Sequence, residues 1–119
     1  MSHGERDVKR YLDNNKILYE SQKKFDKCKI INPLPFDFYL IDYNLCIEYD
    51  GEQHFEPRFS KSNKSVINFE KLQKSDFIKN DFCKKNDIKL LRIPYYDKKN
   101  IKDILEKEIL KWEKRKKLK

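Results

Sequence analysis

The chain has 119 residues, which is enough for a single domain with one modest core. Charged side chains make up 40% of it, and its net charge of +8 is unevenly distributed. Residues 111–119 hold six basic side chains and one acidic side chain, and so carry five of those eight charges. Clustered cations bind polyanions by displacing counterions from phosphates, although a solvated helix end has the same composition. We therefore expect a domain over residues 1–110 and a basic tail over residues 111–119.

The cysteine count and the lack of long apolar segments exclude several classes of protein. Cys28, Cys46 and Cys83 are an odd number and have no CxxC spacing, which argues against a disulfide framework or a zinc knuckle. The N-terminus lacks the apolar segment of a signal peptide, and no stretch approaches the length of a membrane span. We therefore expect an intracellular protein with reduced thiols and no membrane partner.

In chain order, the first expected element is a helix over residues 4–14. Ser2 and Glu5 have the spacing of a capping box, and apolar residues follow at helical intervals. A short strand is expected at 17–19, and a polar, lysine-rich stretch without a strand pattern follows it. Two clearer strands, at 36–40 and 45–50, are joined by a turn-like segment, and the second ends at Gly51.

The second half of the chain is expected to form a loop, a helix, a strand and a last helix. The loop spans 52–63 and the helix 65–86, and the strand at 88–93 is closed by Pro94. Asn100 caps the last helix, which carries apolar residues at helical spacing. A hairpin followed by a strand–helix–strand crossover predicts an α/β fold of the mixed α+β kind, with a central mixed β-sheet flanked by helices.

Acidic side chains alternate with apolar ones on the two central strands. Phe36 and Phe38 are expected on one face of the sheet, and Asp37 on the other. If the strands pair as a hairpin, Asp37 lies close to Glu48 and Asp50 on one face. Such like charges repel each other unless a cation lies between them, although a solvated sheet surface also displays acids. Oxygen ligands of this kind suit Mg²⁺, so we expect a magnesium site.

A histidine and a third acid have both a chemical and a structural interpretation. His54 follows Asp50 by four residues, past a turn at Gly51, and is placed to lean over the carboxylates. Imidazole exchanges protons near neutral pH, although a lone histidine is more often structural. Asp76 lies on an apolar stripe of the helix at 65–86, where an acid needs a partner, unless the stripe is placed differently. By its position alone, Glu5 is only the acid of the capping box.

Together these residues resemble the core of the PD-(D/E)XK nuclease superfamily. The resemblance lies within residues 2–104 and rests on three segments: Phe36-Asp37-Phe38, Ile47-Glu48-Tyr49-Asp50-Gly51-Glu52-Gln53-His54 and Leu91-Arg92-Ile93. The most similar branch contains the very-short-patch repair endonucleases and the EDxHD homing endonucleases of phages and large viruses. The resemblance implies a restriction-endonuclease-like core and a Mg²⁺-dependent endonuclease acting on double-stranded DNA, with Mn²⁺ as a substitute metal. It also implies a location in the cytoplasm or nucleoid.

The resemblance also implies roles for particular residues. Catalytic positions would be Glu5, Asp37, Glu48, His54 and Asp76. Asp37, Glu48 and the backbone carbonyl of Tyr49 would bind the metal ion. Asp76 would orient His54, and Asp81 is a weaker match for that last role.

One position departs from the pattern of the superfamily. The lysine expected two residues after Glu48 is replaced by Asp50. His54, Gln53 or Lys79 would then supply the missing cation or proton donor, and Asp50 could instead bind metal.

The mode of DNA recognition and two rival functions stay open at this stage. No helix-turn-helix or zinc finger is recognisable, so recognition is expected from loops, from a homodimer partner or fused domain, or from the tail. The basic residues of that tail are Lys114, Arg115, Lys116 and Lys117. A nucleic-acid-binding module without activity would explain the tail and Trp112 but not the acids. A zinc-stabilised interaction domain would use the three cysteines and His54, whose spacing is poor for it.

Overall fold

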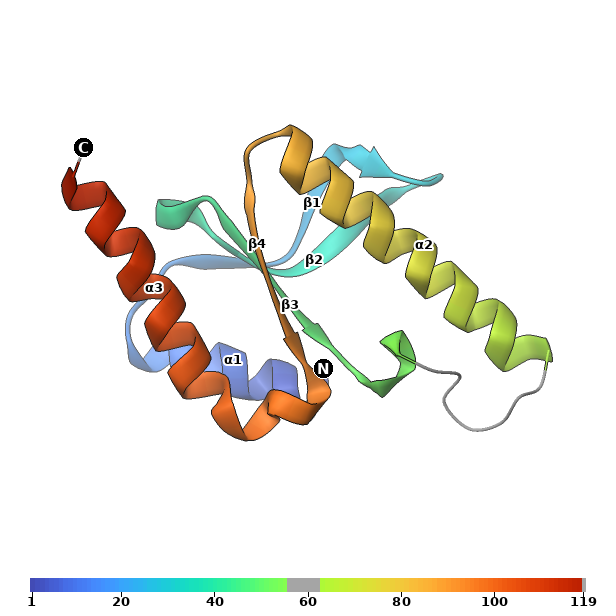
Figure 1. Ribbon diagram of the computed structural model, residues 1–119, viewed down its shortest axis with the longest axis horizontal. Coiled ribbons are helices and arrows are strands. Elements are labelled where there is room, and N and C mark those ends of the chain that lie inside the picture. The colour runs from blue at the N-terminus through green and yellow to red at the C-terminus, as the bar shows by residue number, and fades with distance from the viewer. Residues whose placement is uncertain (56–62, 119) are drawn as a thin grey trace.

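A computed structural model describes residues 1–55 and 63–118 of the chain (Figure 1). Its elements, in order, are α1 (His3–Asn14), β1 (Tyr19–Lys29), β2 (Pro33–Leu40), β3 (Leu45–Asp50), α2 (Asn63–Lys85), β4 (Lys89–Pro94) and α3 (Ile101–Leu118). Short 3-10 turns lie at Ile41–Tyr43, Glu52–His54 and Tyr95–Asn100. The expected α+β fold, a mixed sheet flanked by helices, is confirmed.

The sheet has four strands in the order β1-β2-β3-β4. The pairs β1–β2 and β2–β3 are antiparallel, and β3–β4 is parallel. The turn between β2 and β3 ends at Asn44, whose left-handed backbone (φ 50°, ψ 49°) is a conformation that asparagine tolerates well. A parallel pair needs a long crossover, which α2 supplies. The predicted hairpin and strand–helix–strand crossover are therefore both present.

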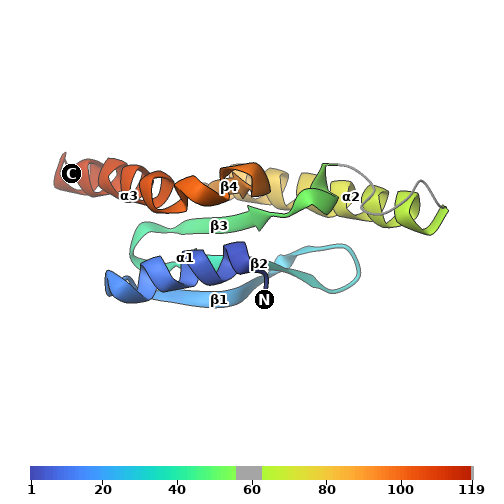
Figure 2. The ribbon, with the colours of Figure 1, turned by 90° about the horizontal axis from the view of Figure 1, so that it is seen from below.

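Two apolar cores lie on the two faces of the sheet. The first joins the sheet to α1 and α3 and contains Val8, Leu12, Phe38, Leu40, Leu45, Ile47, Ile93, Ile101 and Leu105. The second joins the sheet to α2 and contains Cys28, Phe36, Cys46 and Cys83. Figure 2 shows α3 and α2 extending toward opposite ends of the molecule, which is 50 Å long and 19 Å thick. The sheet is therefore covered on both faces, by different helices.

Of the strand predicted at 17–19 only Tyr19 is in a strand, and the lysine-rich stretch after it, predicted without one, continues it as one long strand, β1 (Tyr19–Lys29). Its apolar pattern is weak because β1 is an edge strand, where lysines also protect against edge-to-edge pairing. Only Cys28 of β1 is deeply buried. The strand therefore forms mainly through its pairing with β2, which local sequence does not reveal.

The prediction that Phe36 and Phe38 lie on the same face of the sheet is wrong. Phe38 belongs to the first core and Phe36 to the second. Pairing with β3 ends at Phe38, and Gln22 of the neighbouring β1 has a left-handed backbone (φ 53°) at this level. The regular pleat is interrupted there, so strict alternation of side chains fails.

The strand predicted at 45–50 matches β3 at both ends, and, β1 apart, the ends of the other predicted helices and strands lie within three residues of those in the structure. Of the loop expected at 52–63, residues 52–54 form a 3-10 turn, while residues 56–62 lie outside the described part of the chain. The predicted basic tail is helical over residues 111–118, where it completes α3. Among the described helices, none combines the length and apolar character required to span a membrane.

Candidate active site

Two carboxylates lie where the regular backbone hydrogen bonding between β2 and β3 ends. The last pair of residues in that regular pairing is Phe38 with Ile47. Beyond it, the Asp37 N–H donates to Glu48 Oε1 at 2.8 Å, and the Tyr49 N–H donates to Asp37 Oδ2 at 2.8 Å. Each acid thus accepts a backbone hydrogen bond from the opposite strand. The expected proximity of Asp37 and Glu48 is confirmed, and their side chains are fixed by the backbone.

The Asp37–Glu48 pair is short of positive charge. Glu48 is only 3% exposed, and burial raises its pKa against the opposing effect of Lys79. Burial, and then the neighbouring charge of Glu48, raise the pKa of Asp37 to about 7, and the charge of Glu5 adds to this. These carboxylates therefore repel one another in a poorly solvated place, which favours a bound cation or a retained proton.

A lysine from α2 partly compensates this charge. Lys79 is buried, and its Nζ lies 3.0 Å from Glu48 Oε2. The same ammonium lies 5.3 Å from the centroid of the Phe36 ring. Lys79 therefore places a cation beside Glu48.

Helix α1 begins against the same site. The Glu5 N–H donates to Ser2 Oγ at 3.1 Å, so the predicted cap forms. Gly4 packs so closely on the ring of Tyr49 that an added Cβ would lie 2.0 Å from its Cζ atom. This contact docks the first turn of α1 on β3, and it brings Glu5 within electrostatic reach of Asp37.

A second group of polar residues surrounds His54. The Nδ1 atom of His54 lies 2.8 Å from Asp76 Oδ2 and 3.7 Å from Asp50 Oδ1. The bond to Asp76 raises the pKa of His54, against the opposing effect of burial. When Nδ1–H is donated to Asp76, Nε2 is the nitrogen left to exchange a proton with another molecule. Asp76, which α2 carries, thus holds the imidazole in one orientation.

Arg92 of β4 holds both acids of this second group. Its Nη1 lies 2.9 Å from Asp50 Oδ1 and 3.6 Å from Asp76 Oδ1. Its Nε donates to Asn80 Oδ1 at 2.9 Å, and its Nη2 donates to the Asp76 carbonyl at 3.4 Å. Each nitrogen of the guanidinium thus has at least one protein partner. Sequence analysis missed this role because it depends on the parallel register, which sets Arg92 beside Glu48.

Two places in the site offer ligands to a metal ion. Asp50, His54 and Asp76 each offer one atom within 4.8 Å of the others, and no other such group of three occurs among the described residues. There, however, Arg92 and the imidazolium form of His54 both offset the charge of the acids. The Asp37–Glu48 pair has one buried and one half-buried carboxylate, a third acid nearby and only one ammonium. Its oxygen donors suit Mg²⁺ or Mn²⁺, so we favour this pair as the metal site.

The remaining predicted site residues lie apart from these contacts. The Asp81 side chain is 41% exposed and pairs with Lys85 at 2.9 Å, so of the two predicted candidates it is Asp76 that holds His54. Gln53 folds back on Gly51, with its Oε1 2.7 Å from where a Cβ would stand. The basic residues 114–117 lie at the exposed end of α3.

Sequence analysis also missed an exposed aromatic cluster next to His54. Phe55, Tyr95 and Tyr96 have ring centroids 5.5–5.8 Å apart, and all three are exposed. They come from the segments that follow β3 and β4, so they lie at the same edge of the sheet as the acids. Only the parallel pairing of β3 and β4 brings them together.

The arrangement of cysteines does not fit the zinc-stabilised alternative. Cys28, Cys46 and Cys83 are free and buried together in the second core. Their sulfur atoms do not form a group of three within 4.8 Å, and His54 bonds to Asp76 instead. The three thiols therefore act as small apolar core residues.

Comparison of the chain with family models, curated proteins and solved structures finds no match. Function therefore has to be argued from the geometry of the site.

We predict that Gly4→Ala destabilises the protein, although alanine usually favours a helix over glycine. The new methyl group would overlap the ring of Tyr49, and overpacking of this kind costs about 1–3 kcal/mol. Thermal unfolding followed by circular dichroism measures the effect, and adding Tyr49→Leu to the same chain should restore part of the loss. A melting temperature equal to or above that of the wild type would contradict the close contact.

In metal-free buffer, removing the charge of Asp37 and removing the charge of Glu48 should change the stability of the protein in opposite directions. Asp37 has a pKa of about 7 in the folded protein and about 4 when unfolded, so its ionisation opposes folding as pH rises between these values. Asp37→Asn should therefore be stabilised above pH 7, by up to about 4 kcal/mol, and should match the wild type near pH 4. Urea unfolding at pH 4, 6 and 8 tests this, and equal stability at pH 8 would contradict it.

Glu48→Gln should instead be destabilised by about 3–5 kcal/mol, because it leaves the buried Lys79 without its carboxylate partner. The matched control is the double variant Glu48→Gln with Lys79→Met, which removes the orphaned charge and should recover most of the stability. If the double variant were no more stable than Glu48→Gln, the ion pair would not be the cause.

Proposed function

We propose that the protein is a divalent-metal-dependent endonuclease that hydrolyses phosphodiester bonds in DNA. The observation that carries the proposal is the Asp37–Glu48 pair, which is short of positive charge, together with the imidazole that follows β3 and is already oriented by Asp76. Acids at the surface of a basic protein repel phosphate unless a cation lies between them. A purely binding module therefore gains nothing from this arrangement.

Asp37, Glu48 and the backbone carbonyl of Tyr49 would hold the ion. When bound, Mg²⁺ or Mn²⁺ would draw in the scissile phosphate and lower the pKa of a water molecule. Backbone hydrogen bonds hold Asp37 and Glu48 in place without using all their oxygen lone pairs. Lys79 keeps Glu48 ionised and fixed, which is the contribution the replaced lysine would otherwise make.

His54 would move the proton in this scheme. Its Nε2 would take a proton from the attacking water or give one to the leaving oxygen, while Asp76 stabilises the imidazolium form. Arg92 is bound to Asp50 and to the Asp76 carbonyl, so we assign it the role of a positioning residue for these two acids. Glu5 adds a carboxylate near Asp37 that can orient a water molecule.

Cleavage of supercoiled plasmid with and without Mg²⁺ or Mn²⁺ tests the proposal, and gel separation distinguishes nicked from linear product. Wild-type protein should cut only with metal, and Asp37→Asn should abolish cutting while remaining folded. The matched control is Asp81→Asn, because Asp81 is an exposed acid of α2 that pairs only with Lys85 among the described residues. Cutting by Asp37→Asn at the wild-type rate would remove these acids from the reaction.

His54→Ala should lose about 10²–10⁴-fold in rate while retaining metal-induced stabilisation, since general acid–base help has that magnitude. Asp76→Asn should keep more activity and shift the pH–rate profile. Asp76 raises the pKa of His54, so its removal lowers that pKa and moves the His54 limb of the profile to lower pH. If the pH–rate profile of Asp76→Asn were not shifted, the ionisation of His54 would not be the step that this limb of the profile reports.

A further inference from the structure

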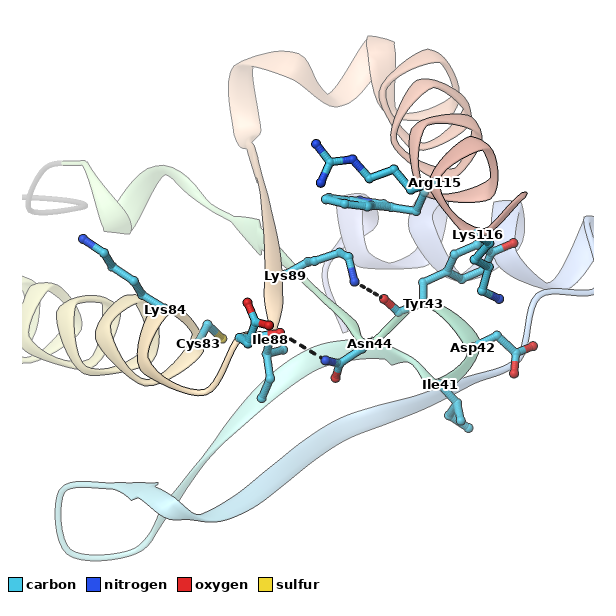
Figure 3. Close-up of a pocket in the computed structure, with 12 residues that line it drawn as sticks. Ile41, Asp42, Tyr43, Asn44, Cys83, Lys84, Ile88, Lys89, Arg115 and Lys116 are labelled. Carbon is cyan, nitrogen blue, oxygen red and sulfur yellow. Dashed lines mark hydrogen bonds between the residues drawn. The ribbon is translucent and has the colours of Figure 1, made fainter. Parts of the chain in front are cut away.

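A pocket of about 620 Å³ lies at the end of the sheet opposite the acids (Figure 3). It is bounded by the turn at Ile41–Tyr43, by the first residue of β4, Lys89, and by the last turns of α3. Strands β3 and β4 begin here and end at Asp50 and Pro94. Five residues of strand span about 16 Å, so the pocket and the acids are separate places. We call it the α3 pocket.

Four cations line the α3 pocket: Lys84, Lys89, Arg115 and Lys116. Two acids, Asp42 and Asp87, also line it, so the lining carries an excess of two positive charges. Within the described part of the chain, none of the four cations is held in an ion pair by a carboxylate, whereas other lysines are. The pocket therefore offers positive charge that the protein itself leaves uncompensated.

Three of these cations, Lys89, Arg115 and Lys116, converge with the neighbouring Lys111 on two aromatic rings. Lys89, Lys111 and Arg115 place their charged groups 4.6, 4.7 and 5.0 Å from the centroid of the Trp112 ring. Lys116 lies 4.6 Å from the centroid of the Tyr43 ring. Three like charges around one indole repel one another, so an anion at this point would be stabilised.

The walls of the pocket are held before any ligand binds. Lys89 Nζ donates to the Tyr43 carbonyl at 2.8 Å, a contact visible in Figure 3. Trp112 Nε1 donates to Glu108 at 2.8 Å, and the Tyr43 hydroxyl donates to Glu113. The two rings are therefore fixed in orientation, which lowers the entropic cost of stacking a ligand on them.

We propose that the α3 pocket binds a segment of single-stranded nucleic acid, with a base that displaces one of the cations over Trp112 and stacks on its ring, and with the adjoining phosphates bound by the surrounding cations. Base–aromatic stacking within a basic groove is the general means of holding unpaired strands. A duplex covers the faces of its bases, so only an unpaired base reaches the indole. The volume lies within the range of ligand pockets and exceeds what a phosphate alone requires. This inference does not depend on the proposed cleavage.

Trp112 is the only tryptophan of the chain, so its fluorescence reports on this pocket alone. Titration with a 12-nucleotide oligo-dT in EDTA should quench the emission, while a 12-base-pair duplex should leave it largely unchanged. EDTA prevents cleavage, and Asp37→Asn should give the same quenching as the wild type. Absence of quenching by oligo-dT, or equal quenching by the duplex, would overturn the proposal even if plasmid cleavage is observed.

Matched charge variants of α3 locate the binding site by fluorescence anisotropy of labelled oligo-dT. Arg115→Ala with Lys116→Ala removes two phosphate contacts and should reduce the slope of log affinity against log salt by about 1.4. Lys107→Ala is the control, since Lys107 is exposed on α3 but does not line the pocket. Equal slopes in the double variant and in the wild type would refute the site, as would an equal loss in Lys107→Ala.

Trp112→Leu should weaken oligo-dT binding about 5- to 150-fold, which corresponds to the loss of one stacked base. Because Trp112 also packs against the first core, circular dichroism must show that this variant is folded. If it does not fold, the two tests above still decide the proposal. Wild-type affinity in a folded Trp112→Leu would exclude stacking.

Discussion

The structure depends most on the two carboxylates that replace the ladder between β2 and β3. A sheet normally extends by pairing backbone groups, and an unpaired buried N–H is costly. Here the N–H groups of Asp37 and Tyr49 are satisfied by acidic side chains of the opposite strands. The sheet therefore remains hydrogen-bonded, while two negative charges are held in a place that water reaches poorly. Removing these acids would disturb the backbone pairing as well as the charge.

That constraint also determines where α2 crosses the sheet. Glu48 is almost wholly buried and needs a cation, which Lys79 supplies. Asp76 and Asn80 lie one turn or less from Lys79 on the same helix, so the crossing that satisfies Glu48 also brings Asp76 to His54 and Asn80 to Arg92. One placement of α2 thus organises both groups of polar residues. The two groups are not independent, although no hydrogen bond or ion pair among the described residues joins them.

The site residues and the proximity of Asp37 to Glu48 could be predicted from sequence, but the cation that pairs with each acid could not. Alternation correctly placed Glu48 and Asp50 on the face opposite Leu45 and Ile47, and the apolar stripe of α2 correctly marked Asp76 as an acid in need of a partner. The sequence shows Asp37 and Glu48 as equivalent acids. Only the crossing of α2 shows that one of them has a lysine partner and the other does not. β1 was missed for a similar reason, because an edge strand forms through its neighbour more than through its own pattern.

The two ends of the parallel strands β3 and β4 differ in charge. The strands begin at Lys89, among the cations of the α3 pocket, and end at Asp50 and Pro94, among the acids and the exposed aromatic rings. Without a divalent ion, a phosphate is attracted at the first end and repelled at the second. On the functions proposed above, binding at the α3 pocket therefore needs no metal, whereas engagement of the acids does. A nucleic-acid strand would then be held before it is cut, and the metal would control only the second step.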